Sequence, residues 1–284
     1  VQALKGKDIR HFQQIIFDTH LHFEKYPGTI AAIDIALHDA FCKYLGISVA
    51  SFYGVKKNGL PTSMTIGIKD VQGTLEDAAE YKDMGFKILK IKTGLDINED
   101  IERVAKLKEK FGNYFIIRVD ANQGYTATQT KQFIDATSNL SLELIEQPIK
   151  VGQEKTIEEL SEGERKILCG DESLKNPTAA LHFAALQYFG IYNIKLMKCG
   201  GVYGARQIAT IAEQANIDLF WGCNDESIVS ITAALHVAYA SRNTKYIDLD
   251  GSFDLAEDIV QGGFELREGC MYINDRPGFG FEKI

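Results

Sequence analysis

The sequence is poor in several features that would point to other classes of protein. Its five cysteines are scattered, odd in number and contain no C-x-x-C pair, which argues against a disulfide framework or a zinc ribbon. No apolar run approaches the roughly 20 residues that span a bilayer, and no signal-peptide pattern stands at the start. A net charge of −8 offers no broad basic face to nucleic acid or to anionic lipid. We therefore expect a soluble cytoplasmic protein that binds neither nucleic acid nor a membrane.

What the sequence does contain is typical of a globular enzyme. Its 284 residues are 45% hydrophobic and 25% charged, enough for one α/β barrel or for two ordinary domains. A chain of this length can bury a large core without covalent staples. The sequence opens at Val1, within a helical pattern, so we expect further residues to precede it.

From about residue 60, short β-branched or aromatic runs alternate with helical stretches such as 100–110, 126–138 and 204–214. This alternation predicts a parallel sheet with crossover helices, and eight strands are the number that closes a (β/α)₈ barrel. An open doubly wound sheet is the structural alternative, but no G-x-G-x-x-G follows the first strand. The predicted strands are 63–68, 86–91, 114–119, 142–145, 166–169, 192–196, 218–221 and 246–249.

The segments on either side of the barrel have a different character. Apolar residues recur at helical spacing in 8–22 and 29–45, and Gly46 is a natural helix stop. We predict a small helical domain over 1–55, the barrel over 56–262, and a short glycine-rich segment over 263–284. This last segment is expected to pack back on the barrel or on the small domain.

Functional side chains of a (β/α)₈ barrel gather at the carboxyl ends of its strands. Candidates at this rim recur every 24 to 28 residues, one for each βα unit. Three of them, Asp120, Glu146 and Asp171, are carboxylates on consecutive strands, which would repel one another without a cation. Oxygen ligands indicate Mg²⁺, with Mn²⁺ as the alternative and one ion per subunit. The seven rim candidates are Lys92, Asp120, Glu146, Asp171, Lys195, Cys223 and Asp248.

Two lysines, Lys92 and Lys195, flank the three carboxylates. Near a cation and partly desolvated, each is expected to lose its proton more easily and to serve as a base. Lys90 shares a face with Lys92, where its charge would lower the pKa of Lys92 and could hold a substrate carboxylate. Asp248 and Asp250 also share a face; they form either a turn-and-cap motif or a pair of acceptors for an ammonium group. His20 and His22 lie outside the barrel and are expected to be ordinary surface or core histidines.

This set of residues resembles the enolase superfamily, in the branch related to muconate lactonizing enzyme. The resemblance rests on Lys90-x-Lys92, Asp120, Glu146-Gln-Pro, Asp171 in G-D-E-S and Lys195 in N-I-K-L, and it extends over nearly the whole chain. It implies that 1–55 is the helical part of an α+β capping domain. The eighth-strand D-x-D and the G-C at the end of the seventh strand are similar to the dipeptide epimerases, including L-Ala-D/L-Glu epimerases.

The resemblance also implies a chemistry. Mg²⁺ held by the three carboxylates, together with Lys90, would neutralise the charge that develops when an α-proton beside a carboxylate is removed. Lys92 and Lys195 would move the proton on opposite faces, while which lysine serves which enantiomer stays open. Asp248 and Asp250 would hold the amino terminus of a small dipeptide such as L-Ala-L-Glu. The remaining residues that would line the substrate are Thr65, Lys90 and Cys223.

One departure from the family and three alternatives accompany this interpretation. Asn224 and Asp225 stand where many relatives have Met, and Asp225 would either favour a cationic or polar dipeptide or, as we prefer, cap the following helix. A cycloisomerase or an o-succinylbenzoate synthase would use the same metal and lysines, but their substrates lack an ammonium group. A non-catalytic metal-binding barrel gives two flanking lysines no evident use. The sequence leaves open whether the chain forms a homo-oligomer.

Overall fold

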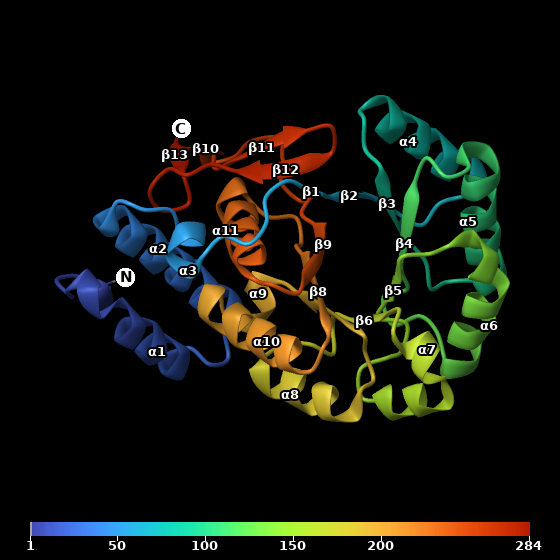
Figure 1. Cartoon of the computed structure of the whole chain (residues 1–284), viewed down its shortest axis with the longest axis horizontal. Coiled ribbons are helices and arrows are strands. Elements are labelled where there is room, and N and C mark those ends of the chain that lie inside the picture. Colours follow the sequence, from blue (N-terminus) through green and yellow to red (C-terminus); the bar gives the residue numbers. More distant parts are fainter. Residues whose placement is uncertain (1) are drawn as a thin grey trace.

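A parallel eight-stranded sheet forms the centre of the computed structural model, which describes residues 2–284 (Figure 1). The strands follow one another in chain order, and all neighbours are parallel. A bridge between Thr62 and Ile247 brings the last strand beside the first, so the sheet curls into a barrel. The strands are β2 (Ser63–Ile66), β3 (Ile88–Lys92), β4 (Ile116–Asp120), β5 (Leu144–Glu146), β6 (Leu168–Gly170), β7 (Ile191–Ile194), β8 (Asp218–Gly222) and β9 (Thr244–Asp248).

Helices that connect the strands cover the outside of the barrel (Figure 1). Side chains cap the amino-terminal ends of several of these helices: Asp96 accepts from the N–H groups of Asn98 and Glu99, and Thr126 forms a capping box with Gln129. The helices are α4 (Val71–Asp83), α5 (Ile97–Phe111), α6 (Ala127–Thr137), α7 (Glu162–Arg165), α8 (Pro177–Leu186), α9 (Leu196–Cys199), α10 (Val202–Gln214) and α11 (Ile228–Ala240), with 3₁₀ turns at Ser138–Leu140 and Glu154–Glu159.

The (β/α)₈ barrel predicted from the sequence is confirmed, and each predicted strand is present with its ends shifted by at most a residue or two. Most shifts share one cause. The residue that opens a predicted strand, such as Phe86 or Tyr114, precedes the first paired residue of the observed strand. The polar residue just after the predicted end, such as Lys92 or Asp120, is still paired with the neighbouring strand. Lys92, Asp120, Glu146 and Asp248 therefore close their strands, whereas Asp171, Lys195 and Cys223 directly follow theirs.

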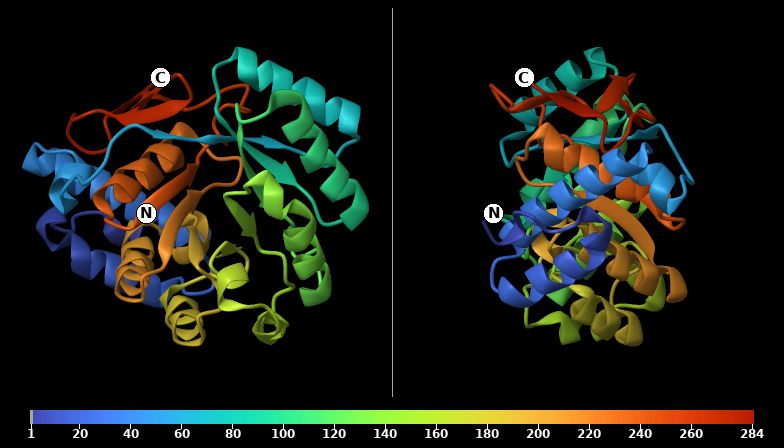
Figure 2. Two further views of the ribbon diagram at one scale, coloured as in Figure 1. Left: turned by 45° about the vertical axis from the view of Figure 1, so that its right-hand side comes forward. Right: turned by 90° about the vertical axis from the view of Figure 1, so that its left-hand side faces the viewer.

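The N-terminal helices pack against one flank of the barrel (Figure 2). Two 3₁₀ turns, Gln2–Leu4 and Ile9–His11, lead into α1 (Phe12–His22), α2 (Pro27–Leu45) and α3 (Val49–Tyr53). Helix α2 ends at Gly46, whose φ of 72° is the left-handed conformation that glycine adopts most easily. Buried Asp34 fastens α2 to the barrel, because its Oδ1 accepts from the N–H of Val202 at 2.7 Å, at the start of α10.

The C-terminal segment forms short strands that contact both the barrel and the N-terminal helices. Strands β11 (Phe264–Arg267) and β12 (Cys270–Ile273) form a hairpin beside β1 (Leu60–Pro61), and β10 (Val260–Gly262) pairs with β13 (Phe281–Lys283). The N–H of Thr62 donates to the carbonyl of Gly269, so the hairpin lies at the amino-terminal end of β2. The carboxyl-terminal ends of the barrel strands therefore lie away from this hairpin.

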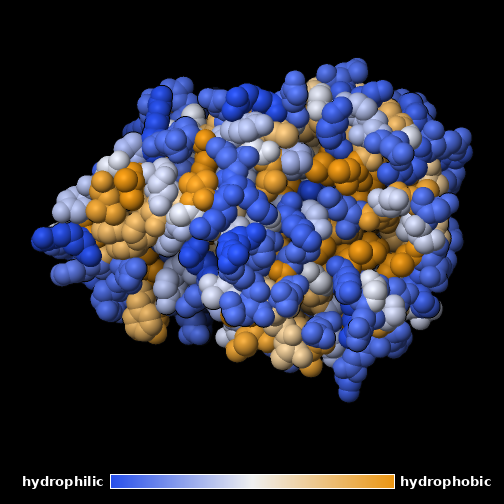
Figure 3. Space-filling model, in the orientation of Figure 1, coloured by the Kyte–Doolittle hydropathy of each residue, from blue (hydrophilic) through white to orange (hydrophobic). Residues whose placement is uncertain are grey.

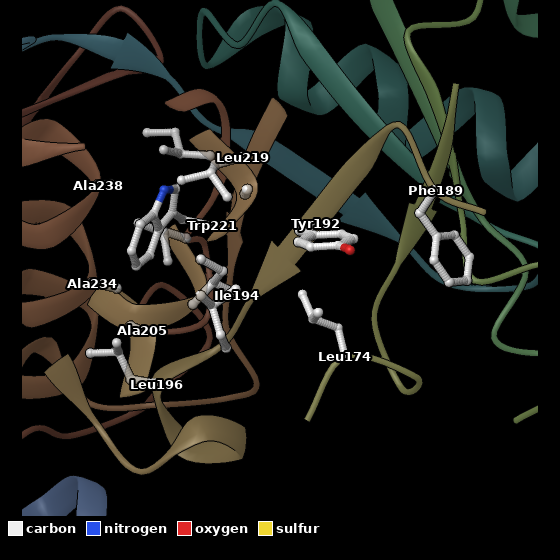
Figure 4. Packing of buried hydrophobic residues seen from close by; sticks show 14 of the residues in the cluster. Leu174, Phe189, Tyr192, Ile194, Leu196, Ala205, Leu219, Trp221, Ala234 and Ala238 are labelled. Carbon is white, nitrogen blue, oxygen red and sulfur yellow. The ribbon is translucent and has the colours of Figure 1, made fainter. Parts of the chain in front are cut away.

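Two apolar layers hold the barrel together. Inside it, Leu144, Cys169, Ile191 and Phe220 from four consecutive strands form a small core. Between sheet and helices, Trp221 is fully buried, faces Ala234 and Ala238 of α11 (Figure 4), and donates from Nε1 to Thr244 at 2.9 Å. This close packing fixes the backbone positions from which the rim side chains extend.

The surface mixes hydrophilic and hydrophobic residues (Figure 3). Several large apolar side chains are exposed on or beside the N-terminal helices, among them Phe17, Leu21, Tyr26 and Tyr44. Within residues 2–284, no helix combines the length and the apolar character needed to cross a membrane.

Candidate active site

Three carboxylates predicted as metal ligands meet at the carboxyl ends of consecutive strands. Strand register places Asp120 beside Glu146, and Asp171 directly follows β6, the next strand. All three side chains are buried, with relative exposures of 0%, 0% and 3%. The barrel thus brings three acidic groups to neighbouring strand ends in a buried region of low dielectric, where their mutual repulsion is strong.

The ammonium of Lys90 lies among acidic groups from both sides of the site. Its Nζ is 2.7 Å from Glu146 Oε2, 3.1 Å from Asp120 Oδ2 and 2.9 Å from Asp248 Oδ2. Burial disfavours the charged lysine, but these three carboxylates outweigh it and raise the pKa of Lys90 well above its ordinary value. Lys90 is therefore a permanent cation at the centre of the rim.

The positive charge of Lys90 alone does not balance the negative charge of the carboxylates around it, as the pKa of Glu146 indicates. Burial, followed by the nearby charge of Asp120, raises the pKa of Glu146 to about 7. Its Oε1 accepts from Asn193 Nδ2 at 2.6 Å, whereas its buried Oε2 accepts no hydrogen bond of good geometry despite the nearby Lys90. The carboxyl group is poised to become fully ionised when more positive charge is supplied.

The donor set therefore fits a hard divalent cation. Three carboxylates from adjacent strands supply oxygen ligands, which Mg²⁺ prefers. Within residues 2–284, no group of three or more His, Cys, Asp or Glu side chains has the arrangement of a finished metal site. Lysine ammonium groups contact each of the three carboxylates. The residues that could hold the ion are Asp120, Glu146 and Asp171.

Lys92 and Lys195 lie across the barrel from each other, on β3 and at the end of β7. Lys92 Nζ donates to Asp120 Oδ2 at 2.8 Å and to Asn122 Oδ1 at 2.9 Å. Lys195 Nζ is 3.0 Å from Asp171 Oδ2. Each lysine therefore contacts one of the outer carboxylates, and the two amines flank the carboxylate cluster, as the sequence predicts. Two amines placed in this way can take a proton on one side of a carbon and return it on the other.

The protein groups around Lys195 by themselves oppose the loss of its proton. Burial does lower its pKa, but the carboxylates of Asp171 and Glu146 have the larger combined effect and raise the pKa above the ordinary value. The sequence argument counted the desolvation and the expected cation, but not the attraction from carboxylates that contact the amine directly.

The D-x-D pair at the end of β9 does not cap a helix. Asp248 accepts from Ser63 Oγ at 2.6 Å and from Lys90, while Asp250 Oδ2 accepts from the N–H of Thr65 at 3.0 Å. Burial and the nearby Asp248 raise the pKa of Asp250 to about 7. Cys223 lies beside the pair, with Sγ 3.3 Å from the carbonyl of Asp248. This corner of the site would therefore be stabilised by a bound cation such as an ammonium group.

Asp225 is exposed, and the interpretation that it caps the next helix is wrong. The first N–H of α11, that of Ile228, donates instead to Asp258 Oδ2 at 2.7 Å, and the N–H of Asn224 donates to Glu226. Among residues 2–284, no side chain pairs with Asp225 in a salt bridge or hydrogen bond. Its charge is thus available at the rim beyond Cys223.

A cavity of about 920 Å³ lies between the rim and the N-terminal helices. His20 belongs to its wall and packs edge-on against Tyr203, with ring centroids 5.1 Å apart, so it does have partners from the barrel. His22 is exposed and its ring contacts the carbonyl of Asp18. The polar side chains around this cavity include Glu24, Gln123, Glu172, Lys175 and Lys198.

Three further residues at the site escaped the sequence argument. Asn193 binds Glu146, Asn122 binds Lys92, and Lys198 donates to Asp171. Their positions offered a weak signal, because Asn193 is two residues before Lys195 and Asn122 is two residues after Asp120, as side chains on one face would be. Lys198 is separated from Lys195 by one helical turn, a spacing that only the short helix α9 explains.

The fold is that of a known family. Residues 73–283 match the enolase C-terminal domain-like family, and the chain belongs to that family. It is 48% identical over 282 residues to an L-Lys-D/L-Arg epimerase of Desulforapulum autotrophicum, covering 99% of this chain and 79% of that protein. It is 30% identical to the L-Ala-D/L-Glu epimerase of Bacillus subtilis, covering 98% of this chain and 77% of that protein. A crystal structure of a dipeptide epimerase from Methylococcus capsulatus, complexed with Mg and L-Arg-D-Lys, has a TM-score of 0.96 and 44% identity, covering 97% of this chain and 78% of that one.

Proposed function

We propose that this chain is a Mg²⁺-dependent dipeptide epimerase that inverts the α-carbon of the C-terminal residue of a dipeptide. The observation that carries the proposal is the pair of lysines, Lys92 and Lys195, facing a cluster of three buried carboxylates from opposite sides of one barrel mouth. The names of the relatives that cover nearly the whole chain support it.

The three carboxylates would hold the Mg²⁺ ion. Asp120, Glu146 and Asp171 supply oxygen donors from adjacent strands, and the raised pKa of Glu146 marks the positive charge that the cluster lacks. The bound ion supplies positive charge that stabilises the negative charge developing on the substrate carboxylate. Lys90 adds a fixed ammonium beside it.

The opposite corner would hold the amino terminus of the dipeptide. Asp250 has a raised pKa, as expected of a carboxyl group that gains from a cation, and Asp248 lies next to it. Thr65 and Cys223 would line the substrate between this corner and the lysines. A substrate without an ammonium group would leave both aspartates without use, which is why we prefer an epimerase to a cycloisomerase or an o-succinylbenzoate synthase.

The lysines would carry out a 1,1-proton transfer. Nζ of one lysine, in its neutral form, takes the α-proton, and Nζ of the other, as an ammonium, gives a proton to the opposite face. Lys195 is an ammonium in the present arrangement, because Asp171 and Glu146 raise its pKa. Neutralising those carboxylates would favour its amine form near neutral pH.

We infer that the preferred dipeptides carry cationic side chains, as in L-Lys-L-Arg, and that L-Ala-L-Glu is a poorer substrate. The relatives at 48% and 44% identity are L-Lys-D/L-Arg epimerases, whereas those at 31% and 30% are L-Ala-D/L-Glu epimerases. The exposed and unpaired Asp225, near the corner proposed for the amino terminus, supports the same preference.

The wider setting follows from the same proposal. Residues 1–55 would be the helical part of a capping domain, 56–262 the barrel, and 263–284 a segment that returns to the capping domain. The protein would act in the cytoplasm on a small-molecule dipeptide, without nucleic acid or membrane, and its oligomeric state is left to experiment.

Exchange of the α-proton with solvent tests the proposal directly. The protein is incubated with Mg²⁺ in D₂O with a panel of dipeptides, and mass spectrometry and NMR follow the gain of one deuteron and the appearance of the second epimer. We expect both with L-Lys-L-Arg, and more slowly with L-Ala-L-Glu. Absence of exchange with every dipeptide of the panel would remove the epimerase proposal.

A further inference from the structure

Lys198 has no part in the proton transfer, yet it makes more contacts with the metal-binding cluster than Lys195 does. Its Nζ donates to Asp171 Oδ1, to the carbonyl of Asp171 at 2.6 Å and to the carbonyl of Asn193 at 3.2 Å. An ammonium has three protons to donate, so these three acceptors saturate it. The ammonium of Lys198 is therefore fixed by its three acceptors and is not available to act as a base.

The local fold explains how Lys198 reaches this position. Lys195 is the N-cap residue of α9, and the single turn of helix that follows carries Lys198 back over the end of β7. Helix α2 packs on this turn from outside, where Asp34 accepts from the N–H of Val202 just after it. The turn is thus fixed on both sides, and the lysine bridges the ends of β6 and β7.

The two oxygens of Asp171 consequently have different partners. Oδ1 accepts from Lys198, whereas Oδ2 is 3.0 Å from Lys195. If Oδ1 were released, the carboxylate could rotate about its last bond and present either oxygen to Lys195. Lys198 prevents this rotation by holding both Oδ1 and the main-chain carbonyl of the same residue.

We propose that Lys198 is a positioning residue, which orients Asp171 for the metal ion and for Lys195. The proposal rests on the proposed function for the role of Lys195, but its effect on metal binding is independent of any dipeptide. A group that orients a metal ligand commonly changes metal affinity or activity by about 10- to 100-fold when it is removed.

The test compares three variants. Lys198→Met keeps the length of the side chain without its donors, and Lys198→Arg keeps a cation that can donate to the same acceptors. Lys175→Met is the matched control, because Lys175 is an exposed lysine on the wall of the same cavity with no contact to Asp171. Circular dichroism and thermal melting establish that each variant is folded, and Lys198→Gln replaces Lys198→Met if the latter does not fold.

The first readout is Mn²⁺ binding without substrate, measured by electron paramagnetic resonance. We expect the dissociation constant to rise about 10- to 100-fold in Lys198→Met, to stay within about fivefold of the unmodified protein in Lys198→Arg, and to be unchanged in Lys175→Met. If Lys198→Gln is the variant used in place of Lys198→Met, the same rise in the dissociation constant is expected, and binding equal to that of the unmodified protein would overturn the proposal. Equal Mn²⁺ affinity in Lys198→Met and Lys175→Met would also overturn it.

The second readout separates orientation from general damage. At saturating Mg²⁺, exchange in D₂O is followed from each epimer; the Lys195→Ala variant first identifies the epimer whose α-proton faces Lys195. Lys198→Met should slow exchange from that epimer about tenfold more than exchange from the other. Equal slowing of both would show a merely structural role. Exchange absent from the unmodified protein, with Mn²⁺ binding still weakened by Lys198→Met, would refute the proposed function and leave Lys198 as the residue that orients Asp171.

Discussion

The two lysines that we assign to the proton transfer have the same chemistry but different surroundings. Lys92 keeps 29% of its side chain exposed and contacts Asn122, in a loop where Asn122 and Gln123 both adopt left-handed φ values of 42° and 68°. Lys195 keeps only 11% exposed and contacts a carboxylate that a second lysine also holds.

The site therefore has an open side at Lys92 and an enclosed side at Lys195. The open side depends on a short loop of unusual backbone conformation, which the surrounding structure must maintain. The enclosed side depends on charges, because Asp171, Lys195 and Lys198 neutralise one another away from water. We therefore expect the Lys92 side to exchange its proton with solvent faster, and the Lys195 side to respond more strongly to changes of charge.

Removal of the metal should affect both sides together and have the largest effect. The three carboxylates lie between the lysines, so chelation with EDTA is expected to reduce exchange from both epimers to background, and added Mg²⁺ should restore it. Rates are followed by NMR in D₂O. Persistence of exchange from one epimer after chelation would contradict the idea that both sides share a single ion.

Removal of either lysine should separate the two sides. Lys92→Ala and Lys195→Ala are each expected to reduce epimerisation by about 10²- to 10⁴-fold, the usual contribution of a general acid or base. Each variant should still exchange the α-proton of the one epimer that faces the remaining lysine. Both variants retaining exchange from the same epimer would show that the lysines do not work on opposite faces.

A substitution at Asn122 tests the open side of the site separately from the enclosed side. Asn122→Ala removes the acceptor 2.9 Å from Lys92 Nζ and should slow exchange from the epimer facing Lys92 about tenfold, the value of one hydrogen bond to a charged group. Exchange from the other epimer should change by less than about threefold. A larger effect on the Lys195 side would place Asn122 in a different role.

Asp225 should have the smallest effect and should not distinguish the two lysines. Asp225→Asn is expected to raise KM about two- to fivefold for dipeptides with cationic side chains, in line with a single exposed charge pair. KM for a neutral dipeptide and the ratio of the two exchange rates should stay unchanged. Equal KM changes for cationic and neutral dipeptides would argue against selection by charge.

The barrel could be predicted because its signal is local. Eight β-branched or aromatic runs, spaced by amphipathic helices, define strands whose ends carry the chemistry, and this placed Asp120, Glu146 and Asp171 at one point. The short helix α9 and the hairpin of β11 and β12 have no such periodicity and were not predicted. Their existence depends on contacts with α2 and with the end of the barrel.

Residues that position other site residues could not be predicted from the sequence for the same reason. Period-two spacing places Asn193 on the face of Lys195, but it does not identify Glu146 as its acceptor. Nor does the sequence identify Asp171 as the acceptor of Lys198, because both contacts cross from one strand end to another. The protonation of Lys195 could not be predicted either, since it depends on the balance between burial and two carboxylates. The role of Asp225 was misjudged because the first N–H of α11, that of Ile228, donates to Asp258, 30 residues beyond Ile228 in the chain.

A crystal structure with Mg²⁺ and a slowly turned-over dipeptide tests the central claim most directly. We expect one ion bound by Asp120, Glu146 and Asp171, and the α-carbon of the second residue lying between Nζ of Lys92 and Nζ of Lys195. An ion held elsewhere, or both amines on the same face of that carbon, would contradict the account.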